Sequence, residues 1–269
     1  MEIKPSLKAV LKRLKLSGML ATLPDRAAYA QKAKLSLEDF LELTLQDEID
    51  RREETNLSGR LQKAGLEELR SLEDFDWDAP VTFDRDRVRD LFSLGFLERA
   101  EDAIFLGPVG VGKTLLACCL GHAACRAGRQ VLFLRADQML KELHQALADN
   151  SRERAVRRLL APDLLIIDDF GLRRLDPTQS SDLYEVVIER HRRASTIVTS
   201  NRSVEEWIAL FDDPILAQSA VDRLAHNAYQ ITMEGPTYRD KLRPGQSPSS
   251  AAETGAHRAG RKLPRTRIG

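Results

Sequence analysis

Apolar residues in the first 70 positions recur at helical spacing. Leu7, Leu11 and Leu14 share one face of a helix that Pro5 can open. Pro24 is expected to interrupt the helix that follows, because proline cannot donate a backbone hydrogen bond inside a helix. No strand pattern occurs in this region, so residues 1–70 are predicted to form a small helical module.

A longer helix is predicted to begin after Ser36. The run Ser36-Leu37-Glu38-Asp39 is a capping-box pattern. An apolar stripe spaced by four residues follows it, formed by Leu37, Leu41, Leu45 and Ile49. A further helix is then expected, carrying Leu57, Leu61, Leu66 and Leu69.

The pattern changes near residue 71. Phe75 and Trp77 alternate in an acidic segment that is expected to be an extended linker. Short apolar runs then alternate with helical patterns, and the expected strands are 103–106, 131–134, 164–167, 196–199 and 229–233. Apolar strands separated by helices are typical of a parallel sheet that is covered on both faces. The prediction for residues 71–243 is therefore an α/β domain with a parallel five-stranded sheet.

Composition removes several classes of protein. No apolar run in the 269 residues approaches the 18 or so that cross a membrane. The first 30 residues mix charges and proline with apolar residues, unlike a secretory signal. The cysteines Cys118, Cys119 and Cys125 are odd in number and lie in a helical pattern, which favours buried thiols over disulfides or a zinc site. A cytoplasmic protein without membrane partners is expected.

Charge is distributed unevenly, although the formal net charge is zero. Residues 1–34 hold eight basic and two acidic residues, residues 38–102 hold nine basic and twenty acidic, and residues 241–269 hold seven basic and one acidic. The segment 244–269 is predicted to be a disordered basic tail. Basic ends, together with the run Arg152, Arg154, Arg157 and Arg158, suggest a polyanion such as duplex DNA. Solvated faces and tails remain an alternative explanation.

A glycine-rich run carries the strongest chemical signal. Residues Gly107, Pro108, Val109, Gly110, Val111, Gly112, Lys113 and Thr114 match G-x-x-x-x-G-K-T, and Leu115 follows. The run lies between a predicted strand and a predicted helix, which is the context that a phosphate-binding loop requires. Lys113 is expected to reach the β- and γ-phosphates of ATP, and the Thr114 hydroxyl to bind Mg²⁺.

Two carboxylates follow the third apolar strand. Asp168 is expected to hold Mg²⁺ through water, and Asp169 to orient or deprotonate an attacking water. Helix capping is the alternative role for such residues. The D-x-x-G and D-F-G patterns that begin here lack the guanine motif of GTPases and the H-R-D of protein kinases. Asn201, after the fourth strand, can hydrogen-bond the attacking water.

Taken in order, five motifs resemble the IstB family. They are G-P-V-G-V-G-K-T, L-L-I-I-D-D-F-G-L, T-S-N, D-R-L-A-H and G-P-T-Y-R, and residues 10–243 share the likeness. That family comprises ATP-dependent helpers of insertion-sequence transposition. It is close to the helicase loader DnaC, within the initiator clade of AAA+ P-loop ATPases.

The resemblance implies roles for two arginines. Arg223 would be an arginine finger that reaches the γ-phosphate bound by a neighbouring subunit, and Arg239 would read the nucleotide of its own subunit. Asp169 stands where most AAA+ proteins have Glu, which suggests slow hydrolysis.

The leading hypothesis is an ATPase that forms homo-oligomers through ATP-bridged interfaces on duplex DNA and delivers target DNA to a cognate transposase. A DnaC-like helicase loader, whose helical module binds protein, is the alternative. A nucleotide or small-molecule kinase is a third possibility.

Overall fold

Five parallel strands form one sheet in the computed structural model, which describes residues 3–77 and 79–237. The strands are β1 (Asp102–Leu106), β2 (Val131–Arg135), β3 (Leu164–Phe170), β4 (Ser195–Ser200) and β5 (Ala228–Thr232). Their order across the sheet is β2-β3-β4-β1-β5, and every neighbouring pair is parallel. Each predicted apolar run overlaps one strand, so the predicted α/β fold with five parallel strands is confirmed.

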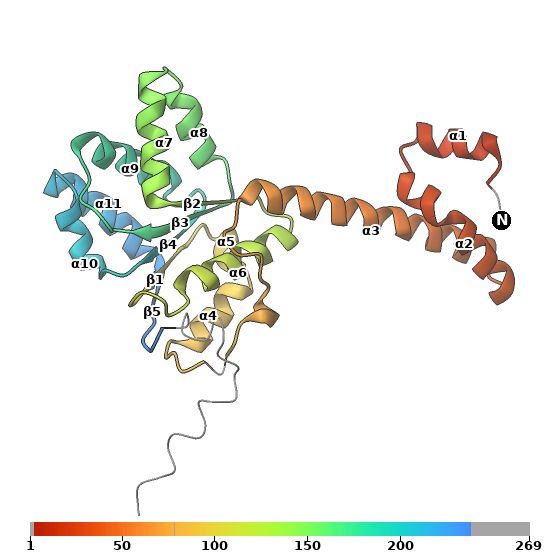
Figure 1. The fold of residues 1–269 in the computed structure, drawn as a ribbon, viewed down its shortest axis with the longest axis horizontal. Coiled ribbons are helices and arrows are strands. Elements are labelled where there is room, and N and C mark those ends of the chain that lie inside the picture. The colour runs from red at the N-terminus through yellow and green to blue at the C-terminus, as the bar shows by residue number, and fades with distance from the viewer. Residues whose placement is uncertain (1–2, 78, 238–269) are drawn as a thin grey trace, which may run out of the picture.

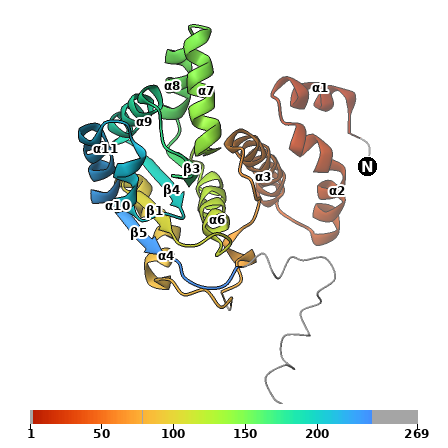
Figure 2. The same ribbon diagram turned by 60° about the vertical axis from the view of Figure 1, so that its left-hand side comes forward.

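Helices cover both faces of this sheet (Figures 1 and 2). One face packs against α6 (Lys113–Arg126), α4 (Arg85–Phe92) and α5 (Gly95–Glu98). The other packs against α7 (Ala136–Ala148), α8 (Arg152–Leu160), α9 (Pro177–Arg190), α10 (Val204–Trp207) and α11 (Pro214–His226), with a short 3₁₀ turn, η2, at Ile208–Leu210. Successive strand residues such as Leu165 and Ile166 point to opposite faces, and both are fully buried. The core is therefore two apolar layers separated by the sheet.

The N-terminal helices lie apart from the sheet (Figure 1). They are α1 (Pro5–Arg13), α2 (Ser17–Ala33) and α3 (Leu37–Ala64), and α1 and α2 pack at the far end of α3. The helix α3 is continuous over 28 residues and ends at Gly65, which has a left-handed φ of 64°. The separate helix predicted for Leu57–Leu69 is therefore wrong, since Leu57 and Leu61 belong to α3 and nothing before Gly65 stops it. The predicted helical character of the region is confirmed.

Pro24 does not interrupt its helix, in contrast to the prediction. It lies inside α2, which continues to Ala33. Contacts with α3 hold α2 in place: Arg26 donates to Asp47 at 2.7 Å, and the backbone N–H of Gly18 donates to the Glu48 carboxylate at 2.6 Å. These tertiary contacts offset the hydrogen bond that proline cannot make.

The last turns of α3 reach the sheet. Leu57 and Leu61 pack against the core layer beside α6, and Arg60 Nε donates to the carbonyl of Cys125 at 2.8 Å. The next residues form a short 3₁₀ turn, η1 (Leu72–Asp74), and the buried ring of Phe75 meets Trp77 edge-on. The segment is therefore packed onto the core. The division of the chain at residue 70 stays a prediction.

Several predicted features concern exposure. The stripe Leu37, Leu41, Leu45 and Ile49 is exposed, as are Leu7 and Leu14 of α1. The three cysteines are buried, and burial raises the pKa of the Cys118 and Cys125 thiols to about 11, so their prediction as buried thiols is confirmed. In the residues that the structure describes, no helix combines the length and the apolar character needed to cross a membrane. The basic tail 244–269 lies outside the described residues.

Candidate nucleotide site

The glycine-rich run forms the turn between β1 and α6. Gly107 follows the last residue of β1, and α6 begins at Lys113. Gly107 and Gly110 have φ of 144° and 89°, which side chains rarely tolerate. A Cβ on Gly107 would lie 2.1 Å from the carbonyl oxygen of Met233, and one on Gly110 would lie 2.1 Å from Thr237 Oγ1. The turn thus requires glycine both for its backbone and for the close approach of the chain after β5.

Lys113 lies within this turn. Its side chain is buried, and its ammonium group donates to the carbonyls of Gly107 and Pro108, each at 2.8 Å. Val111 and Leu115 are buried beside it, whereas Val109 is exposed at the tip. The loop is therefore anchored by its apolar residues and holds a positive charge at the N-terminus of α6, where the helix dipole is also positive.

Three oxygen-bearing side chains meet next to the loop. Thr114 Oγ1 donates to Asp168 Oδ1 at 2.9 Å, and Thr199 Oγ1 donates to the same oxygen at 2.6 Å. Asp168 is 1 % exposed, and this burial raises the pKa of its carboxyl, while the two hydroxyls act in the opposite direction. The structure therefore brings the predicted residues Thr114 and Asp168 together.

Thr199 was not singled out by the sequence. It lies in β4 beside β3, and its hydroxyl also accepts the backbone N–H of Asp169 at 3.0 Å. A threonine in an apolar strand is ordinary, so its signals were its place in the T-S-N motif and its position near the carboxyl end of the strand. The predicted Asn201 lies two residues later, exposed, after the end of β4.

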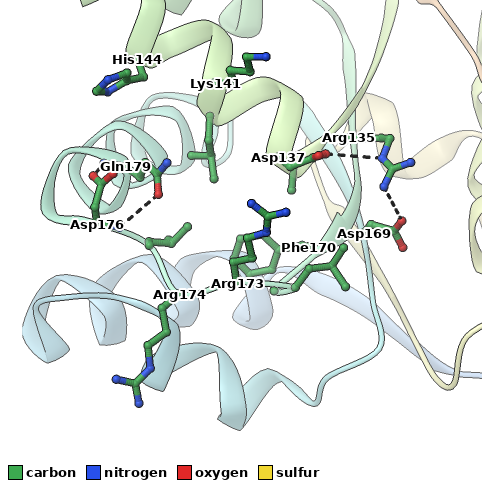
Figure 3. Close-up of a pocket in the computed structure, with 15 residues that line it drawn as sticks. Arg135, Asp137, Lys141, His144, Asp169, Phe170, Arg173, Arg174, Asp176 and Gln179 are labelled. Carbon is green, nitrogen blue, oxygen red and sulfur yellow. Dashed lines mark hydrogen bonds and ion pairs between the residues drawn. The ribbon is translucent and has the colours of Figure 1, made fainter.

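Asp169 faces away from Asp168. The register of β3 and β4 shifts between Ile167 and Phe170, and Asp169 takes a left-handed φ of 55°. Its carboxylate is 44 % exposed and forms an ion pair of 3.5 Å with Arg135 at the end of β2 (Figure 3). A strained non-glycine residue of this kind is common at functional sites. The two carboxylates thus occupy different environments, one buried beside the loop and one at the surface.

Of the two predicted arginines, the structure describes Arg223 alone. Arg223 lies on α11, which covers the sheet face opposite α6, and its guanidinium donates to the carbonyl of Ser219 at 2.8 Å on its own helix. Arg239 lies outside the described residues. Thr237, two positions before it, is the residue that touches Gly110.

The residues present suit a nucleotide with Mg²⁺. The glycine turn leaves a cradle of backbone beside the Lys113 ammonium, and Thr114 and Asp168 supply hard oxygen atoms of the type that Mg²⁺ prefers. Among residues 3–77 and 79–237, no group of three or more His, Cys, Asp or Glu side chains could hold a metal ion.

Comparisons with known proteins identify relatives that are described as ATP-binding. A protein of an insertion sequence in Mycobacterium tuberculosis, described as ATP-binding, is 40 % identical over 246 residues, which are 91 % of this chain and 98 % of that protein. The ATP-binding protein of insertion sequence IS21 from Pseudomonas aeruginosa is 35 % identical, covering 87 % and 89 % of the two chains.

Solved structures show the same fold. The crystal structure of DnaI matches with a TM-score of 0.51 and 20 % identity, covering 62 % of this chain and 92 % of that one. The family model for the IstB-like ATP binding protein matches residues 9–245. The chain therefore belongs to the IstB-like family of ATP-binding proteins.

Proposed function

We propose that this protein is an ATP-hydrolysing helper of transposition that assembles on duplex DNA and delivers target DNA to a cognate transposase. The observation that carries the proposal is the cluster of Lys113, Thr114 and Asp168 at the phosphate loop of an IstB-like chain. The relatives belong to insertion sequences, which supports a role in moving DNA. We place the protein in the cytoplasm, where it would meet its DNA.

The residues of the site divide the chemistry among them. Lys113 and the backbone N–H groups of the loop bind and neutralise the phosphates of ATP. Thr114 and Asp168 would hold Mg²⁺, which would supply positive charge at the reacting phosphate. Asp169 accepts a proton from the attacking water or orients it, and Asn201 hydrogen-bonds that water.

Asp169 requires a rearrangement for this role. Its ion pair with Arg135 directs the carboxylate along the surface beside β2. Rotation of the side chain away from Arg135 would bring it toward the phosphate loop. Slow hydrolysis follows, because the aspartate is short and is engaged elsewhere.

Arg223 acts between subunits in this proposal. It lies on the far face of the sheet from α6, so it serves a neighbouring subunit's γ-phosphate better than that of its own subunit. Arg239 would read the nucleotide of its own subunit, from the segment that follows Thr237. The ATP-bridged contacts that result would build the homo-oligomer.

Lys113→Ala tests the phosphate site. Each charge-assisted hydrogen bond contributes about 1.5–3 kcal/mol, so ATP affinity should fall roughly a hundredfold or more. Titration with a fluorescent ATP analogue measures this. Lys32→Ala, which removes an exposed lysine of α2, is the control and should bind normally. Unchanged ATP affinity in Lys113→Ala would show that ATP does not bind at this loop.

Arg223→Ala tests the assembly. The variant should bind ATP nearly normally and hydrolyse it about 10³-fold more slowly, because a guanidinium supplied in trans has effects of this size. Mixing it with Lys113→Ala protein should restore hydrolysis, since some interfaces then join an intact Lys113 to an intact Arg223. Arg193→Ala, on an exposed arginine of the α9 end, is the control. Absence of complementation, with activity per subunit independent of concentration, would contradict a role in trans.

The helicase-loader alternative rests on the resemblance to DnaC that the sequence motifs carry, because the match to the solved structure of DnaI, at 20 % identity, supports the fold alone. Stimulation of transposase activity by the purified protein, measured against stimulation of helicase loading, decides between them. A small-molecule kinase would show neither effect and no dependence on DNA.

A further inference from the structure

A hollow of about 560 Å³ opens beside Asp169, at the carboxyl ends of β2 and β3. The helix α7 forms one wall, and the loop between β3 and α9 forms the other (Figure 3). Its lining includes five basic or ionisable side chains, namely Arg135, Lys141, His144, Arg173 and Arg174. No assigned role of the nucleotide site uses the last four.

The acidic residues of the hollow are already engaged. Arg135 pairs with both Asp137 and Asp169, each at 3.5 Å. Asp176 caps α9, where its carboxylate accepts the backbone N–H of Gln179 at 2.8 Å. These acids therefore do little to neutralise the remaining cations.

Three cations of the hollow remain available. Lys141, Arg173 and Arg174 are exposed, and none forms a hydrogen bond or ion pair with any residue that the structure describes. We call these three residues the basic rim. In Figure 3 their charged ends point in different directions, with Arg173 between Lys141 and Arg174. Cations that point in different directions suit the successive phosphates of a polyanion better than they suit one small anion.

The basic run on α8 is different, although the sequence pointed to it. Arg152 pairs with Asp182 at 2.8 Å, Arg157 with Glu153 at 3.3 Å, and Arg158 with Glu142. Ion pairs within the protein must break before these arginines can bind phosphate. Arg154 is exposed and has no such pair with any described residue, so the run on α8 offers one available cation where the basic rim offers three.

We propose that the basic rim of Lys141, Arg173 and Arg174 is the contact surface for the phosphate backbone of duplex DNA. This inference rests on the DNA binding stated under the proposed function. Of the two aromatic rings that line the hollow, Phe170 is buried against Trp207 and the His144 imidazole alone is exposed, so a row of stacked unpaired bases has no platform here. Binding through phosphates carries no base sequence, so the contact should be insensitive to sequence.

The triple variant Lys141→Ala/Arg173→Ala/Arg174→Ala tests the surface. Each lost phosphate contact lowers the slope of log affinity against log salt by about 0.9 and weakens binding roughly tenfold near 0.1 M salt. The full-length variant should therefore lose about 2–3 from the slope and about 10²–10³-fold in affinity for a random-sequence duplex. Fluorescence anisotropy at several salt concentrations measures both, and binding of a fluorescent ATP analogue should be unchanged.

The control removes the same charge elsewhere. Arg89→Ala/Arg157→Ala/Arg193→Ala deletes three exposed arginines, each paired with an acid three or four residues before it in the chain. It should keep the wild-type salt slope. Equal losses of DNA affinity in both triple variants, or a wild-type salt slope in the rim variant, would overturn the assignment. A rim variant that lost only its stimulation of the transposase would also overturn it, because the rim would then be a protein contact. Failure of the wild-type protein to bind duplex DNA would instead overturn the proposed function.

Discussion

The sheet and the N-terminal helices are stabilised by different means. Each face of the sheet buries a continuous apolar layer, in which residues such as Ile166 are fully covered. Among the described residues, the apolar cluster at the far end of α3 is small, with Leu11, Met19 and Leu23 as its buried centre. It relies on Glu48, a buried carboxylate that binds the start of α2. Polar contacts thus stabilise the packing of the helices, whereas burial of apolar side chains stabilises the sheet.

The difference also explains where apolar side chains are exposed. The sheet uses nearly all the apolar residues of its strands, whereas α3 leaves Leu41 and Leu45 about half exposed. A sequence stripe of leucines is therefore no guarantee of burial within the same chain. The number of helices available to cover it decides the outcome.

The largest expected effect separates a sheet residue from a stripe residue. Ile166→Ala should cost about 2–5 kcal/mol of unfolding free energy because it leaves a cavity in the core. Leu41→Ala, on the exposed stripe, should change it by about 0.5 kcal/mol or less. Urea unfolding followed by tryptophan fluorescence measures the sheet, since Trp77 and Trp207 both pack in its core layers, and far-UV circular dichroism follows the helices as well. Similar losses in the two variants would contradict the comparison.

A smaller effect is expected at the polar centre of the helices. In Glu48→Gln the neutral side chain gives weaker hydrogen bonds to Gly18 and Met19 and no ion pair with Arg52. Amide exchange in α2 should accelerate about tenfold, because charge-assisted bonds are lost, while the sheet is unaffected. Glu42→Gln, on the exposed side of α3, is the matched control. Acceleration spread over the sheet would show that the two regions unfold together.

The two regions are also expected to differ in pH dependence. Hydrogen bonds from Arg26 and Thr22 lower the pKa of Asp47 to about 2. Burial raises the pKa of Glu48, but bonds from Arg52, Arg51, Gly18 and Met19 outweigh it and bring the pKa to about 2. Both values lie below those of the unfolded chain, so their stabilisation is present above pH 4.5 and is lost as the pH falls toward 2.

The sheet contains a carboxyl group whose pKa is shifted in the opposite direction. Burial raises the pKa of Asp102 to about 7, although its carboxylate accepts the backbone N–H of Thr196. Its stabilisation is complete below the unfolded value of 3.8 and is lost as the pH rises through 7. Lowering the pH from 7 to 5 should therefore protect the sheet and leave the helices unchanged, and further acid should loosen the helices first. Residue-resolved amide exchange across this range checks the order.

Prediction from sequence succeeded where one local rule decides the outcome. The apolar runs gave the strands, and the glycine-rich run gave the turn before α6, because both depend on neighbouring residues alone. The continuity of α3 and the helical Pro24 depend on packing between helices, which no local pattern contains.

The nucleotide site shows the same limit. Thr114 and Asp168 belong to motifs with known spacing, and they meet as expected. Thr199 joins them only because β4 lies next to β3, and Arg135 meets Asp169 only because β2 lies on the other side. Strand order therefore had to be known before either partner could be identified.

The uninterrupted α3 also has a mechanical consequence. At 1.5 Å per residue, its 28 residues span about 42 Å. Its base is fixed to α6 through Arg60 and Cys125, and α6 begins at Lys113 of the phosphate loop. The fixed end of α3 thus lies at the opposite end of α6 from the phosphate loop, about 18 Å along the helix axis. A tilt of about 10° at this fixed end would move α1 and α2 by about 7 Å.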